Sequence, residues 1–205
     1  MSSAPPAAPS GAISRIRAVA VFCGSRMGHD PAAREAAAAM GAGLAAGGMR
    51  LVYGGGRNGL MGVVADEALA AGGQVSGVIP DFLRAQEAAH HGVTDLIVTA
   101  TMHERKTQMY ELADAFVVLP GGLGTLDETA EVVTWRQLGL HDKPILVVDI
   151  NGWGQRLTTL LESFIDAGFA APATRKLYRV VPDVAAALHH LAMTPAPSRG
   201  QADRL

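Results

Sequence analysis

Two short segments of the chain concentrate side chains that could do chemistry. One is Met102–Lys106, which contains Arg105, and the other is Pro120–Glu128, a glycine-rich turn that leads to Glu128. A carboxylate can stabilise developing positive charge or deprotonate a water molecule, and a guanidinium can hold an anion or orient a carboxylate. We expect Arg105 and Glu128 to face one crevice if the strands that precede the two segments are neighbours.

The charges in these segments lie near predicted helix starts. Asp127 and Glu128 are expected in the first turn of a helix, where its dipole favours a carboxylate, so helix capping is an alternative explanation for either. Arg105 and Lys106 are harder to explain in that way, because a cation near a helix start opposes the dipole. An anion or a carboxylate nearby would offset that cost, which favours a functional role for Arg105.

Glycine-bearing turns follow three predicted strands. Glycine allows close approach of a ligand to the backbone, and a helix that begins in such a turn offers free N–H groups to a phosphate. A single turn of this kind is equally consistent with a tight bend, but three on one sheet favour phosphate or nucleotide binding. The residues concerned are Gly24 and Ser25, Gly54, Gly55 and Gly56, and Gly121, Gly122, Gly124 and Thr125.

Familiar nucleotide and metal motifs do not fit these turns. Gly54, Gly56 and Gly59 have the spacing of a dinucleotide fingerprint, but no acidic residue ends the next strand to bind a ribose, which argues against NAD. No glycine turn carries the lysine of a P-loop. His103-Glu104 begins a zincin motif, but Thr107 stands where the second histidine is required. We therefore expect neither a metal nor an organic cofactor.

Short β-branched runs alternate with longer helical stretches along the chain. This alternation predicts an α/β fold, a Rossmann-like three-layer domain with a doubly wound parallel sheet, whose ligands bind beyond the carboxyl ends of the strands. The expected strands are Ala18–Cys23, Arg50–Tyr53, Gln74–Ile79, Asp95–Thr99, Ala115–Leu119 and Pro144–Asp149. The expected helices are Pro31–Ala46, Leu60–Ala71, His103–Ala113, Leu123–Leu138, Gly154–Ala167 and Asp183–Leu191.

Composition sets the remaining limits. The chain has 205 residues, 49% of them hydrophobic, which is enough for one domain with a substantial core. We expect a disordered tail over residues 1–15, the domain over 16–192 and a flexible tail over 193–205. The net charge of −2 gives no general attraction to nucleic acid or membranes, and no segment reads as a signal peptide or a membrane span. A single cysteine excludes an internal disulfide and favours a cytoplasmic location.

The motifs together resemble the LOG (Lonely Guy) family of cytokinin-activating phosphoribohydrolases, long misdescribed as lysine decarboxylases. The main ones are M-H-x-R-K at Met102–Lys106 and P-G-G-x-G-T-x-x-E at Pro120–Glu128. The segments Tyr53–Gly62 and Thr134–Pro144 are also similar, and the resemblance covers residues 18–191. Leu123 and Asp127 depart from the family pattern, which commonly has an aromatic residue and a glutamate there.

The resemblance implies hydrolysis of the N-glycosidic bond of a nucleoside 5′-monophosphate, giving an adenine-type base and ribose 5-phosphate. It places Arg105 and Glu128 in catalysis and Lys106, Glu87 and Thr134 at the substrate. It also suggests a homodimer with the site near its interface, and no metal or pyridoxal phosphate. Two alternatives stay open: a nucleotide-binding carrier or sensor without catalysis, and a nucleosidase that accepts nucleoside monophosphates, AMP included, without cytokinin preference.

Overall fold

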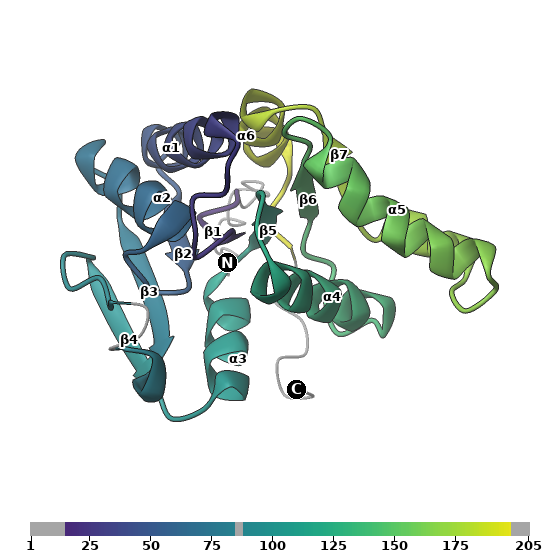
Figure 1. Ribbon diagram of the computed structural model, residues 1–205, viewed down its shortest axis with the longest axis horizontal. Coiled ribbons are helices and arrows are strands. Elements are labelled where there is room, and N and C mark those ends of the chain that lie inside the picture. The colour runs from purple at the N-terminus through teal and green to yellow at the C-terminus, as the bar shows by residue number, and fades with distance from the viewer. Residues whose placement is uncertain (1–14, 85–87, 198–205) are drawn as a thin grey trace, which may run out of the picture.

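The computed structural model describes residues 15–84 and 88–197. Its seven parallel strands form one sheet in the order β4-β3-β2-β1-β5-β6-β7, with helices on both faces (Figure 1). The predicted doubly wound α/β fold is therefore confirmed. The strands are β1 (Ala18–Phe22), β2 (Arg50–Tyr53), β3 (Val75–Pro80), β4 (Asp95–Thr99), β5 (Ala115–Val118), β6 (Ile145–Val148) and β7 (Arg179–Val181).

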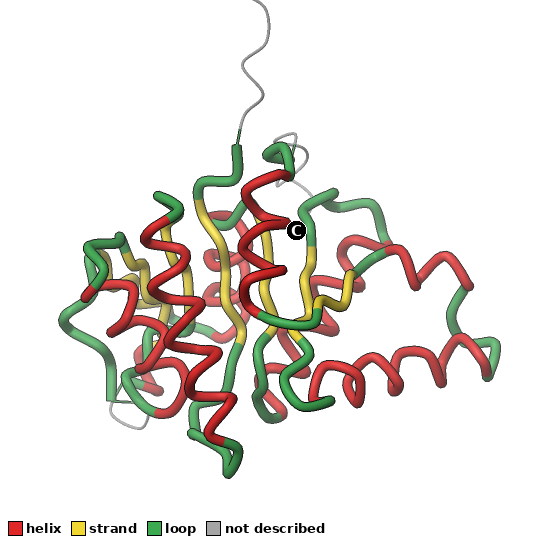
Figure 2. Tube along the Cα trace, turned by 90° about the horizontal axis from the view of Figure 1, so that it is seen from above, coloured by secondary structure: helices red, strands yellow, loops and turns green. Residues whose placement is uncertain are grey.

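Two layers of helices enclose the sheet, as the view from above in Figure 2 also shows. Helices α1, α2 and α6 pack on one face of the sheet, and α3 and α4 pack on the other. Each face of the sheet has its own apolar core. Helix α5 extends outward beside α4 (Figure 1). The bounds are α1 Pro31–Ala46, α2 Gly59–Ala70, α3 Met102–Leu112, α4 Leu123–Gln137, α5 Trp153–Asp166 and α6 Val184–Met193, with short 3₁₀ helices at Asp81–Leu83 and Pro172–Lys176.

The central strand β1 lies where the winding of the sheet changes direction. It pairs with β2 on one side and with β5 on the other, and all five of its residues are buried. Full burial explains why β1 reads as a continuous apolar run, since helices cover both faces of the sheet there. A crevice is expected outside the carboxyl ends of strands at such a switch point, so the loops after β1 and β5 are the first place to look for a ligand.

Strands β4 and β5 are not neighbours, which corrects the condition under which Arg105 and Glu128 were expected to meet. β4 is an edge strand, and three strands separate it from β5. Helix α3 nevertheless returns the chain from that edge across β3, β2 and β1. This crossover carries Arg105 to the middle of the sheet, so the two residues can meet without adjacent strands.

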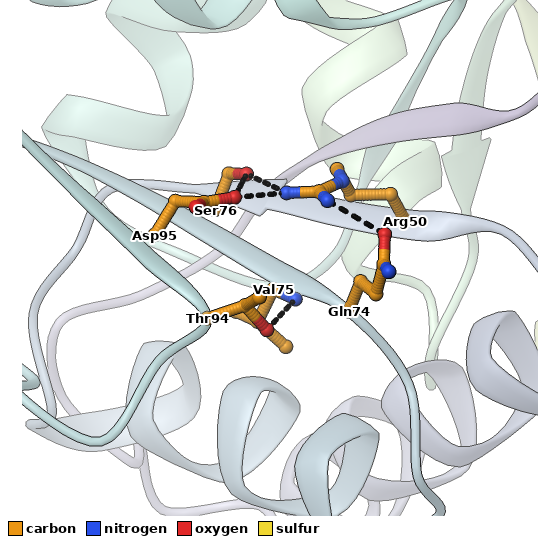
Figure 3. Close-up of polar contacts among 6 residues, drawn as sticks. All are labelled: Arg50, Gln74, Val75, Ser76, Thr94 and Asp95. Carbon is orange, nitrogen blue, oxygen red and sulfur yellow. Dashed lines mark hydrogen bonds and ion pairs between the residues drawn. The ribbon is translucent and has the colours of Figure 1, made fainter.

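A polar network ties the edge strand to its neighbours at the amino ends of the strands (Figure 3). Arg50 of β2 pairs with Asp95 of β4 and donates a hydrogen bond to Ser76 of β3 at 2.7 Å. Its second amino group donates to Gln74 at 2.6 Å. One guanidinium therefore joins three strands at the edge of the sheet opposite to the glycine turns.

The loop between α4 and β6 fixes the carboxyl ends of both α3 and α4. The ring of His141 hydrogen-bonds to the carbonyl of Val132 in α4 at 2.8 Å, and Lys143 Nζ donates to the carbonyl of Tyr110 in α3 at 2.6 Å. The Lys143 ammonium also lies 3.7 Å from the centre of the Tyr110 ring. Burial lowers the pKa of His141 to about 4 and that of Lys143 to about 8.

The lowered pKa of His141 predicts acid sensitivity. The folded chain keeps this ring neutral, so the contribution of His141 to the free energy of unfolding is fully present above pH 6.5, the ordinary pKa of histidine. This contribution is lost as the pH falls toward 4. We expect a loss of up to about 1.4 kcal/mol per pH unit from this residue. His141→Gln keeps a donor for Val132 and should flatten the acid limb of a chemical unfolding series measured from pH 7 to 4. The exposed His91→Gln serves as the control, and an unchanged acid limb in His141→Gln would contradict the assignment.

No helix in the described part of the chain has both the length and the apolar character that crossing a lipid bilayer requires. Residues 1–14 and 198–205, most of the two predicted tails, lie outside the described residues. Arg15 and Pro195, from the inner ends of these tails, form an isolated antiparallel bridge.

Candidate functional site

The three glycine turns meet at the carboxyl ends of β1, β2 and β5. Gly24 donates its backbone N–H to the carbonyl of Pro120 at 3.0 Å and accepts a bond from the N–H of Met61 at 3.3 Å. Gly59, with φ of +60°, has no room for a Cβ beside Ser25. The structure thus brings the three turns together at one edge, as the sequence predicts.

Arg105 and Glu128 form a buried ion pair beside these turns. Arg105 Nη2 lies 3.1 Å from Glu128 Oε1, and only 8% and 9% of the two side chains are exposed. Arg105 Nε donates a second bond to the carbonyl of Val78 at 3.1 Å. Because a buried charge is costly unless it is paired, this pair fixes both side chains in one geometry.

A reciprocal cap sets the position of Arg105 on α3. The Thr101 hydroxyl accepts a bond from the Glu104 N–H at 3.1 Å, and the Glu104 carboxylate accepts one from the Ala100 N–H at 2.9 Å. This is a variant of the capping box, which satisfies free N–H groups at a helix start. Glu104 therefore has a structural role at the helix start.

Gly54 gives the guanidinium its space. A Cβ at this position would collide with Arg105 Nη2 and lie 2.9 Å from Met61 Sδ. Arg105 cannot move aside without loosening its bonds to Glu128 and Val78. The middle glycine turn therefore serves the ion pair directly, a role that was not foreseen from the sequence, which suggested only phosphate binding for Gly54.

This packing yields a prediction for Gly54→Ala. We expect the added methyl group to displace Arg105 and to lower turnover at least about tenfold, which corresponds to about 1.4 kcal/mol of transition-state stabilisation. Steady-state kinetics on the nucleotide substrate proposed below would measure it. Gly92→Ala is the control, since the Cβ there would meet only the His90 ring, at 3.1 Å. Normal turnover in Gly54→Ala would show that this position of Arg105 is not needed.

Lys106, like Arg105, pairs with carboxylates of helix α4. Its ammonium lies 2.9 Å from Asp127 Oδ2 and 3.3 Å from Glu131 Oε1. Burial acts to lower the pKa of Lys106, but the two carboxylates outweigh that effect, so the pKa is raised and the side chain stays charged. Asp127 and Glu128 are the fifth and sixth residues of α4, which corrects their predicted place in its first turn. They pair with α3 rather than cap α4.

Cys23 lies at the end of β1, close enough to Glu128 to be influenced by its charge. The thiol is buried, and burial followed by the negative charge of Glu128 raises its pKa. It therefore stays protonated at neutral pH and is a poor nucleophile. Phe22, the last residue of the central strand, lines the same small gap as Glu128.

A cavity of about 600 Å³ opens beside the loops after β1, β5 and β6. Of the predicted residues, Gly24, Ser25, Gly121 and Gly122 line it. Arg105 and Glu128 are not among its lining residues, and Glu128 and Lys106 instead border a gap of about 10 Å³ between α3 and α4. The amino end of α4 thus lies between an open cavity and the buried ion pair.

The other predicted residues differ in their surroundings. Gly122 and Gly124 are exposed at the start of α4, and Thr134 is exposed further along this helix. Thr125 is buried against Gly121, and its hydroxyl has no hydrogen-bond partner among the described residues. The turn after β2 contains Gly55, with φ of +77°, and Gly56, which bridges to Ala89. Glu87 lies outside the described residues.

Several residues at this edge were not predicted. The loop after β6 contributes Asn151 to the cavity, and the start of α5 contributes Trp153 and Arg156. That loop also follows a strand and could have been included on that ground. The carbonyl of Val78, which holds Arg105, could not have been found, because a backbone acceptor leaves no mark in the sequence. Within residues 15–84 and 88–197, no group of three His, Cys, Asp or Glu side chains is placed to hold a metal ion.

Comparison with known proteins places this chain in a family. Residues 61–191 match the family model described as "Possible lysine decarboxylase". The chain is 46% identical to a cytokinin riboside 5′-monophosphate phosphoribohydrolase of Rhodococcoides fascians over 84% of this chain and 87% of that protein. It is 41% identical to an Arabidopsis thaliana protein of the same name, over 83% of this chain and 78% of that protein.

Solved structures show the same fold at lower identity. The molybdenum cofactor binding protein of Rippkaea orientalis superposes with a TM-score of 0.65 at 20% identity, covering 86% of this chain and 96% of that one. The Moco carrier protein of Chlamydomonas reinhardtii gives a TM-score of 0.65 at 23% identity, over 86% and 96%. These structures support the architecture alone. The family match and the identity to the two phosphoribohydrolases show that the chain belongs to the LOG (Lonely Guy) family, whose family model still bears the lysine decarboxylase description.

Proposed function

We propose that the protein hydrolyses the N-glycosidic bond of cytokinin riboside 5′-monophosphates, AMP or both, releasing an adenine-type base and ribose 5-phosphate. The buried Arg105–Glu128 ion pair, 3.1 Å apart beside the glycine turns, is the observation that carries this proposal. The names of the Rhodococcoides fascians and Arabidopsis thaliana relatives support the substrate class.

Glu128 supplies the chemistry at the ribose. Cleavage of the glycosidic bond develops oxocarbenium character, which a nearby carboxylate stabilises while it orients or deprotonates the attacking water. The bond to Arg105 orients Glu128, and the surrounding burial strengthens the electrostatic effect of its carboxylate. The Arg105 guanidinium is also a donor that can assist the departing base.

The amino end of α4 binds the 5′-phosphate. Gly122 is the N-cap of this helix and offers no side-chain cap, so the N–H groups of its first turn are available to an anion. Gly121 and Gly124 let a phosphate approach the backbone, and the unpartnered hydroxyl of Thr125 beneath Gly121 is a further donor. Lys106, Thr134 and Glu87 complete the substrate contacts, with Lys106 oriented by Asp127 and Glu131.

A carrier or sensor would need the glycine turns but not the ion pair, and this separates the two classes of function. The purified protein should be incubated with AMP and with isopentenyladenosine monophosphate, and the free base measured by chromatography. Release of base from either nucleotide supports hydrolysis. Saturable binding of both nucleotides without release of base would instead favour the carrier.

We also propose a cytoplasmic homodimer with the site near its interface. Apolar side chains are exposed on α4 and α5, where a second copy could cover them: Leu123, Leu138, Leu160 and Phe164. The buried single cysteine suits a reducing compartment. Light scattering after size exclusion tests the assembly, since a measured mass equal to one chain of 21.2 kDa would reject it.

A further inference from the structure

A second cavity lies at the opposite edge of the sheet from the glycine turns. It has a volume of about 410 Å³ and sits where β6 and β7 begin, with the end of α4 on one side and α6 on the other. Five basic side chains line it: Arg136, Arg175, Lys176, Arg179 and His190. None of its lining residues within 15–84 and 88–197 carries a carboxylate, although Glu162 and Asp166 pair with Arg175 outside the cavity.

Contacts outside the cavity hold two of these cations in place. Arg136 donates to the carbonyl of Leu177 at 2.9 Å, and Arg175 Nε donates to the Glu162 carboxylate at 2.7 Å. Lys176 and Arg179, in contrast, form no ion pair with any residue of the described ranges 15–84 and 88–197. The cavity thus combines fixed guanidinium groups with two uncompensated charges.

Positive charge in this cavity acts on His190, one of its lining residues. Burial lowers the pKa of His190, and the positive charges of Arg179 and His189 lower it further. Burial also lowers the pKa of Arg136, although Asp142 opposes that change. An anion that enters the cavity offsets the repulsion among the positive charges gathered around it.

We propose that this cavity is a binding site for a small phosphorylated ligand, separate from the catalytic edge. Guanidinium groups bind phosphate oxygens in a bidentate manner, and three arginines line the cavity. The floor formed by Ile145 and Leu146 is apolar, and a volume of 410 Å³ exceeds the space that one phosphate fills, so an organic phosphate ester fits better than the free ion. The concave shape favours a small ligand over an extended polyanion.

Inorganic phosphate and ribose 5-phosphate serve as probes in a titration followed by NMR at the His190 ring protons, at constant ionic strength. We expect saturable shifts with both probes and tighter binding of the ester. Arg179→Glu should weaken this binding at least tenfold. Arg17→Glu makes the same charge change at the same edge of the sheet but outside the cavity, and should leave the dissociation constant within about twofold.

Shifts that do not saturate, or an equal loss in Arg17→Glu, would overturn the proposal by showing only diffuse electrostatic attraction. Tighter, Arg179-dependent binding of a single-stranded oligonucleotide than of either phosphate would also overturn it, in favour of a polyanion. Because the signal comes from His190, the result does not depend on whether the protein cleaves nucleotides. Arg179→Glu should retain the rate of base release, which separates this site from the catalytic edge.

Discussion

We expect Glu128→Gln to lower the rate of base release at least about a hundredfold. Glutamine keeps the size of the side chain and its hydrogen bond to Arg105 but lacks the negative charge. A neutral amide cannot stabilise the positive charge that develops on the ribose, nor accept a proton from water. The loss should fall mainly on kcat, since the charge matters most in the transition state. Steady-state measurement of free base from AMP checks the prediction.

Loss of the charge also affects stability, and this must be measured separately. Removing one partner of a buried ion pair costs about 3–5 kcal/mol in general, and glutamine should cost less because it still accepts a bond from Arg105. The free energy of unfolding in urea should therefore be measured together with the rate of base release. Glu35→Gln, on the exposed face of α1, is the matched control and should change neither quantity. Near-normal turnover in a folded Glu128→Gln protein would remove Glu128 from the mechanism.

The fold was largely predictable because all the predicted strands except the edge strand β4 are buried almost throughout. Such strands read as apolar runs, and all six that were predicted are present within a few residues of their expected bounds. The seventh strand, β7, was missed since it has three residues, two of them exposed at the sheet edge, and so shows no usable pattern. The order of the strands in the sheet could not be predicted from local sequence patterns, because the edge position of β4 depends on how α3 crosses the sheet.

The meeting of Arg105 and Glu128 could be expected from the sequence, but most of the contacts around them could not. A cation near a helix start, as at Arg105, indicates that a negative charge lies nearby. In the structure this charge is the Glu128 carboxylate. The packing of Gly54 beneath the guanidinium could not be foreseen, because glycine spacing does not say which atom approaches the backbone. Likewise, the sequence did not show that the large cavity and the ion pair lie on different sides of the start of α4.

Removal of the 5′-phosphate from the substrate should have the other large effect. If the first turn of α4 binds this group, adenosine lacks the contact that holds the ribose against Glu128, and binding energy from that remote group no longer aligns the reacting carbon. We expect kcat/KM for adenosine to be at least about a thousandfold below that for AMP, with a decrease in kcat as well as an increase in KM.

Both kinetic constants are needed to locate the phosphate contribution. A change in KM alone would mean that the phosphate binds equally well in the ground state and the transition state, so that it adds affinity without aligning the ribose. Adding phosphite to the adenosine reaction tests the same idea, because a separate anion bound at Gly122–Thr125 should restore part of the rate. Gly124→Pro removes an N–H donor from the first turn of α4. This variant should therefore abolish the rescue by phosphite. Equal kcat/KM values for adenosine and AMP would contradict phosphate binding at α4, and the exposed glycines at its start would then require another explanation.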